Sequence, residues 1–145
     1  MAITSAICNS FKVEILKAVH NFTESANTFN IALYTSSATL NKSTTAYTTS
    51  NEISNTSGSA YTAKGKALTN VTPVLSTDTA VCDFANVSFT SASFTANGCL
   101  IFNDTATGDP AVCAIAFGSD KTVTSGTFTI QFPTADASNA IIRIA

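Results

Sequence analysis

The stretch Ala80-Val-Cys-Asp-Phe-Ala-Asn-Val-Ser-Phe-Thr-Ser-Ala-Ser-Phe-Thr-Ala-Asn-Gly-Cys-Leu-Ile-Phe-Asn103 decides the fold class of this chain. Apolar side chains alternate with small polar ones through much of it, and this period of two is what a half-buried β-strand requires. The stretch therefore predicts short strands in succession over 80–84, 87–94 and 98–103. Because such a series is not stable alone, we expect neighbouring strands to cover its apolar face.

Further strand patterns lie on both sides of this stretch, separated by turn sequences rich in Gly, Asn, Asp and Pro. One such turn is predicted at 118–121, and Pro73 restricts its own strand to an edge or a bulge. The added strands are expected at 28–35, 66–76, 111–117, 122–132 and 139–145. About eight short strands predict an all-β fold, an antiparallel β-sandwich or jelly-roll-like domain.

The N-terminal part of the chain carries the one good helix pattern. Residues 11–22 place Phe11 and Ile15 on one face at helical spacing, with Ser10 positioned as the N-cap. An isolated amphipathic helix of this length is marginal, so we expect it to dock on the β domain or on a neighbouring subunit. We therefore divide the chain into an N-terminal arm and helix, 1–22, and a single β-sandwich domain, 23–145.

A long polar segment, 36–62, interrupts the strand pattern. Loops of this length in compact domains are usually functional or ordered by a partner. The segment is either a contact surface, with Tyr47, Ile53 and Tyr61 as its apolar anchors, or a self-packed crossover between two sheets. For the contact reading, we add Phe11 and Ile15 of the helix as candidate contact residues.

Composition limits the function classes. The chain has 145 residues, a formal net charge of -2, and only 11% charged residues against a typical value of about 25%. The few Lys and Arg residues are scattered, which argues against nucleic acid as a partner. No stretch is apolar and long enough for a membrane span, and charges in the first twenty residues argue against a secretory signal.

The cysteines leave two readings open. Cys8, Cys82, Cys99 and Cys113 are either buried free thiols in a protein made in a reducing cytoplasm, or include a bridge between neighbouring strands. The bridges considered are Cys99 to Cys113 and Cys82 to Cys99.

A search for catalytic and metal-binding motifs finds none. The chain lacks a Gly-rich phosphate loop, a nucleophile elbow and a CxxC pair, and its single histidine, His20, has no partner residues in a zinc or triad pattern. Asp104 and Asp109 do not match the spacing of a calcium loop. Most aspartates lie in turn sequence, where Asp is common for backbone reasons. We therefore expect no enzymatic activity, no metal and no cofactor.

Several segments resemble a family of small proteins encoded among the virion structural genes of tailed bacteriophages. They are Phe29-Asn-Ile-Ala-Leu-Tyr-Thr35, Thr44-Thr-Ala-Tyr-Thr-Thr-Ser-Asn-Glu-Ile53, Tyr61-Thr-Ala-Lys-Gly-Lys-Ala-Leu68, Asp83-Phe-Ala-Asn-Val87, Gly98-Cys-Leu-Ile-Phe-Asn103, and Phe117-Gly-Ser-Asp-Lys121 through Phe128-Thr-Ile-Gln-Phe-Pro133. The resemblance covers about residues 11–145. It implies a β-rich, often oligomeric protein without enzymatic activity, made in the host bacterial cytoplasm and located on the phage particle. It assigns no binding residues.

The resemblance and the composition together predict a capsid decoration or cement protein. We expect it to bind the major capsid protein or other virion proteins, to form a homotrimer, and to stabilise the head lattice. The alternative is a tail, neck or fibre component, including a module that binds glycans on the host surface. The absence of Trp and of fibre-like repeats argues against glycan binding.

Overall fold

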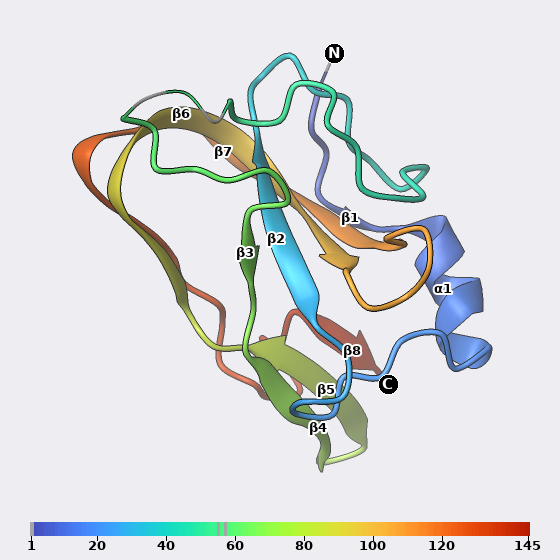
Figure 1. The fold of residues 1–145 in the computed structure, drawn as a ribbon. Helices are drawn as coiled ribbons and strands as arrows, with labels where there is room; N and C mark the ends of the chain where they lie inside the picture. The colour runs from blue at the N-terminus through green and yellow to red at the C-terminus, as the bar shows by residue number, and fades with distance from the viewer. Residues whose placement is uncertain (1, 55, 57) are drawn as a thin grey trace.

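The computed structural model describes residues 2–54, 56 and 58–145. Within this part of the chain, two antiparallel sheets and one short N-terminal helix form a sandwich-like fold (Figure 1). The prediction of an antiparallel sandwich of about eight strands is thus confirmed. The elements are β1 (Ala6–Ile7), α1 (Asn9–Leu16), β2 (Phe29–Tyr34), β3 (Lys66–Ala67), β4 (Asn70–Ser76), β5 (Thr79–Phe84), β6 (Val87–Asn103), β7 (Ala111–Ile130) and β8 (Ile142–Ile144).

The larger sheet has the strand order β1-β7-β6-β2-β3, and the smaller sheet has the order β4-β5-β8. In the larger sheet, every residue of β2 is buried, and β2 lies between β6 and β3. β4 is an edge strand, and its register shifts between Val71 and Val74, around Pro73. Pro73 therefore lies at an edge and beside a bulge, as its missing N–H predicted.

β6 and β7 are continuous where the sequence predicted breaks. The expected strands 87–94 and 98–103 are one strand, and the expected turn at 118–121 is wrong, because β7 continues through it. Bulges take the place of the turns: the β6–β7 register shifts near Gly98, and Gly118 adopts a positive φ of 83°. Cross-strand contacts such as Thr95 to Thr122 hold the pairing together across this region.

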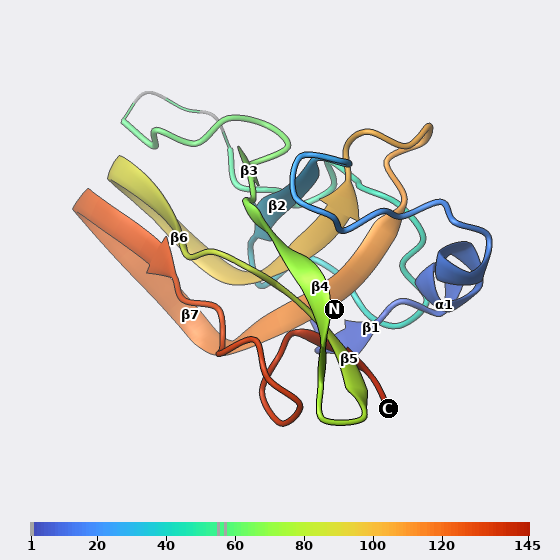
Figure 2. The same ribbon diagram turned by 90° about the horizontal axis from the view of Figure 1, so that it is seen from below.

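The bulges curl the far half of the β6–β7 hairpin away from the larger sheet, and we call this half, residues 87–97 and 118–130, the ribbon. It leads to the smaller sheet at the opposite end of the molecule (Figures 1 and 2). Between the sheets, Phe22 stacks on Phe29 with ring centroids 4.3 Å apart, and Phe84 approaches Phe29 at 5.8 Å. This aromatic cluster joins the N-terminal segment, the larger sheet and the smaller sheet in one core.

The helix is shorter than predicted and begins earlier. α1 spans Asn9–Leu16 with Cys8 at the N-cap, so the predicted range 11–22 and the predicted Ser10 cap are wrong. The helix ends where Ala18 adopts a left-handed φ of 58°, with the N–H of Val19 bonded to the carbonyl of Glu14 at 3.0 Å and that of Ala18 bonded to Ile15 at 3.3 Å. These two bonds form a Schellman motif, which stops a helix without glycine at some conformational cost.

No helix in the described part of the chain is both long and apolar enough to span a membrane.

Candidate functional site

The polar segment 36–62 packs against the larger sheet on the side opposite the smaller sheet (Figure 1). Tyr47 stacks on Phe102 of β6 with centroids 4.8 Å apart, and the N–H of Ile53 donates to the carbonyl of Leu33 in β2 at 2.9 Å. These contacts show that the segment packs on its own chain, but it joins β2 to β3, which are neighbouring strands of the larger sheet. The predicted crossover between two sheets is therefore wrong, and we call the segment the β2–β3 connection. Asn55 and Ser57, which belong to the segment, lie outside the described residues.

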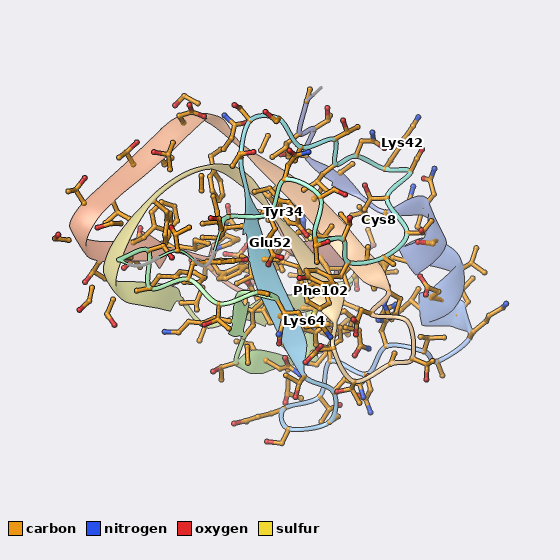
Figure 3. All side chains as sticks on the ribbon, turned by 45° about the horizontal axis from the view of Figure 1, so that its top comes forward. Cys8, Tyr34, Lys42, Glu52, Lys64 and Phe102 are labelled. Carbon is orange, nitrogen blue, oxygen red and sulfur yellow. The ribbon has the colours of Figure 1, made fainter. Side chains whose placement is uncertain are left out.

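Glu52 holds the β2–β3 connection in place. Its carboxylate accepts hydrogen bonds from the hydroxyls of Tyr47 at 2.6 Å and Tyr61 at 2.7 Å, and from the N–H of Lys64 at 2.8 Å. Figure 3 shows Glu52 beside β2, with Tyr34 and Lys64 close by. Burial and the bond to Glu52 raise the pKa of Tyr47 to about 12, and the same two causes raise the pKa of Tyr61 further. These groups are structural, since neutral tyrosine donors satisfy a single carboxylate.

Lys64 extends the network to the loop between β6 and β7. Its Nζ lies 2.8 Å from Oδ1 of Asp104 and 2.8 Å from Oδ2 of Asp109. The pKa of the Lys64 ammonium is raised, first by the hydrogen bond to Asp104 and then by that to Asp109. The two carboxylates that the sequence offered for calcium are therefore both bound by an ammonium group.

The candidate contact residues divide by burial. Tyr61, Ile53 and Phe11 are buried in the core of the single chain, so in this conformation their side chains are not available to a partner. These apolar residues of polar or amphipathic sequence fix the β2–β3 connection and the helix to the core of their own chain. Tyr47 and Ile15 are half-buried, and their contact with a partner stays a prediction.

His20 lies in the core, below the end of α1. Its Nδ1 is 3.2 Å from Nδ2 of Asn103, and its Nε2 is 3.8 Å from Oε1 of Glu14, too long for a hydrogen bond. With Asn103 donating to Nδ1, the ring proton is assigned to Nε2. Burial lowers the pKa of His20, and Glu14 opposes this shift only in part. His20 is thus a neutral core histidine that fixes the segment after α1 to β6.

Asp83 of β5 is the other buried ionisable group outside the described networks. Oδ1 accepts the N–H of Phe84 at 2.8 Å, while Oδ2 is buried without a hydrogen-bond partner. Burial raises the pKa of Asp83. Among the described residues, no side chain is hydrogen-bonded to this carboxyl group.

All four cysteines are free and buried. The bridges considered from the sequence are not formed: Cys99 lies opposite Ile115, and Cys113 lies opposite Ile101. Burial raises the pKa of Cys8 to about 11 and the pKa values of Cys82 and Cys99 to about 12. Among residues 2–54, 56 and 58–145, no three His, Cys, Asp or Glu side chains gather in a group that could hold a metal ion.

The large exposed apolar side chains belong to the helix and to two strands of the smaller sheet. Leu16 of α1 is 89% exposed, Leu75 of β4 is 72% exposed and Ile144 of β8 is 60% exposed. The strand register places Leu75, Ala80 and Ile144 in one cross-strand row. The large apolar side chains that are exposed in the described chain all belong to α1, β4 and β8: Val13, Leu16, Val71, Val74, Leu75 and Ile144. We call Leu16, Leu75 and Ile144 the apolar end.

A groove of about 600 Å³ lies between α1 and β8. Ile15 and Leu16 line its helix side, and Ile142 and Ile144 line its strand side. Lys12 and Arg143 are the charged residues on its walls. A second concavity of about 550 Å³ lies in the curl of the ribbon, where Phe117 and Phe128 of β7 approach Ile141.

Sequence reasoning missed the apolar end. Leu16 lies off the predicted helix stripe, and that position was itself a signal, because a leucine on the polar side of a short helix has no place in the core. Leu75 and Ile144 follow strand periodicity, and periodicity does not say which strand face a second layer covers.

Comparison with known proteins gave no match to a protein-family model, to a curated protein or to a solved structure.

Proposed function

We propose that this protein is a non-enzymatic virion structural protein of a tailed bacteriophage, a capsid decoration or cement protein that binds the head lattice through its apolar end. The observation that carries the proposal is that exposed Leu16 and Ile144 line one groove, with exposed Leu75 in the same cross-strand row as Ile144. Clustered exposed apolar side chains mark protein interaction sites, whereas scattered ones are ordinary. The resemblance of the chain to phage virion proteins supplies the class of partner.

The low charge of the chain supports a protein partner. With 11% charged residues and a net charge of -2, the surface lacks the long-range field that steers binding to charged polymers. Interface cores are depleted in charged residues in the same way. Binding through the apolar end should therefore change little with salt, because apolar burial supplies the free energy.

The groove between α1 and β8 gives this end the shape of a receptor for an apolar side chain. Exposed Leu16 and Ile144 line the groove from the helix and from β8, and buried Phe11 also lines it. Self-association into a trimer requires a heterologous contact, in which one patch of each subunit meets a different patch of the next. In this proposal the contact between subunits lies outside the apolar end, because the apolar end faces the head lattice.

Two measurements test the proposal. Size-exclusion chromatography with light scattering gives the oligomeric state, and sedimentation with expanded phage heads that lack this protein measures binding. We expect a trimer that sediments with the heads at micromolar concentration, as well in 500 mM salt as in 50 mM salt. A monomer that stays in the supernatant would contradict the proposal.

Variants locate the contact. Leu16→Asp and Ile144→Asp each place a charge in the lining of the groove. Each variant should weaken head binding at least tenfold, because burying an unpaired charge is strongly unfavourable. Both positions are exposed, so the fold should remain. The matched control is Thr124→Asp on the exposed part of β7, which should bind as the parent does. Equal loss in all three variants would show that the apolar end is not the contact.

A further inference from the structure

The concavity in the curl of the ribbon is a second site, distinct from the apolar end. It has a volume of about 550 Å³, within the range of small-molecule sites, which runs from about 300 to 1,000 Å³. Ile115, Phe117 and Phe128 of β7 line it on one side, and Phe132 and Ile141 line it on the other. All five side chains are half-buried, so each presents part of its apolar surface to the hollow.

The backbone explains why this hollow stays open. Bulges carry the ribbon away from the larger sheet, so Phe128 no longer faces a complete second layer. The segment after β7 returns Ile141 over part of the gap, and the smaller sheet lies beyond it. The hollow is therefore an opening into the space between the two sheets. Apolar side chains line this opening, and the chain itself does not fill it.

One charged residue lines this opening. Lys121 is the single charged residue that lines the concavity, and its ammonium forms no ion pair or hydrogen bond with any described residue. Its sequence neighbour Asp120 accepts a hydrogen bond from Asn97 at 2.9 Å. An apolar hollow with one unpaired cation is complementary to a molecule with an apolar body and one negative group.

We propose that the ribbon concavity binds a small amphipathic monoanion, of the class of medium-chain carboxylates, with its apolar body against Phe117 and Phe128 and its carboxylate at Lys121. A protein partner fits this site less well. The strongly exposed apolar side chains that a protein interface uses are on α1, β4 and β8, whereas the walls here are concave and only partly exposed. The inference is independent of the capsid proposal and holds for any role of the chain.

Calorimetric titration with decanoate, below its micelle concentration, tests the site. We expect saturable binding of one decanoate per chain, at least tenfold weaker in Lys121→Met, because the charge-assisted bond is lost. Lys42→Met removes an exposed lysine that lines neither hollow and should bind as the parent does. Ile115→Trp fills the concavity and should abolish binding. Decan-1-ol, which lacks the charge, should bind the parent no better than decanoate binds Lys121→Met.

Amide chemical shifts locate the ligand and report the fold of each variant in the same spectra. We expect decanoate to shift the amides of Phe117, Phe128 and Ile141 and to leave that of Leu16 in place. Absence of saturable binding to the parent would overturn the proposal. So would binding that survives both Lys121→Met and Ile115→Trp, or shifts confined to the groove beside α1.

Discussion

Tyr61 and Glu52 are joined by a hydrogen bond of 2.7 Å between the tyrosine hydroxyl and Oε1, and the same hydroxyl accepts the N–H of Leu33 in β2 at 2.9 Å. The phenol thereby links the β2–β3 connection to β2. Both of its hydrogen-bonding directions are used inside the protein. A segment with the composition of a mobile loop is held by one carboxylate and two tyrosines.

Glu52→Gln should lower the free energy of unfolding by about 1 to 3 kcal/mol, because the amide replaces one charged acceptor oxygen by a donor that faces a tyrosine hydroxyl. Urea unfolding followed by circular dichroism measures the change. Glu24→Gln, at an exposed glutamate, is the control and should stay within about 0.5 kcal/mol of the parent. Equal stabilities for the two variants would show that Glu52 does not anchor the β2–β3 connection.

Stability should fall in mild acid because of His20. The pKa of His20 in the folded chain lies below its unfolded value of 6.5. Below pH 6.5, the unfolded state therefore binds a proton at this residue more readily than the folded state does. The stabilising contribution is therefore complete above pH 6.5 and is lost as the pH falls below it, by at most about 1.4 kcal/mol per pH unit.

The comparison with His20→Leu isolates this titration. Among the described residues, Glu14 is the ionisable partner of the ring, and it is present in both proteins. The difference in unfolding free energy between parent and variant should be constant above pH 7 and should move in favour of the variant between pH 6.5 and pH 5. Parallel curves over the whole range would show that folding does not lower the pKa of His20.

Ala18→Gly should stabilise the protein by up to about 1 kcal/mol. Ala18 ends α1 with a φ of 58° and is exposed, so glycine removes the conformational strain without loss of packing. The matched control is Ala26→Gly, at an exposed turn residue without a positive φ, where glycine should lower stability. Thermal unfolding compares the two variants, and a loss of stability in Ala18→Gly would contradict the left-handed helix end.

The four thiols should be inert in the folded protein. Burial raises the pKa of Cys8 to about 11 and that of Cys99 to about 12, so almost no thiolate exists at pH 8. We expect no reaction with an aromatic disulfide reagent at pH 8 until denaturant is added, and then four equivalents without a reductant. A count of two in denaturant would reveal a disulfide and contradict the free-thiol structure.

The period-two pattern predicted the strands well and their boundaries poorly. β2 and β5 lie where alternation indicated them, because alternation is set by which face is buried. The pattern could not show that β7 continues through Gly118-Ser119-Asp120-Lys121. A sequence that reads as a turn can equally form a bulge, and only pairing with β6 decides between the two.

The candidate site was harder to predict than the fold. Tyr61 and Ile53 looked like contact residues because the sequence around them is polar, yet apolar residues in a polar segment are also what fixes it to its own domain. The apolar end depends on which faces of α1 and β4 a second layer leaves bare. That is a property of topology, and local sequence does not encode it.

Cryo-EM of phage particles produced with and without the gene for this chain tests the decoration proposal most directly. We expect density on the outer surface of the head, at local three-fold positions, into which the sandwich fits with Leu16 and Ile144 facing the lattice. This density should be absent from particles of the deletion strain. Identical heads in the two preparations, or extra density found only on the tail, would contradict the proposal that the protein decorates the capsid.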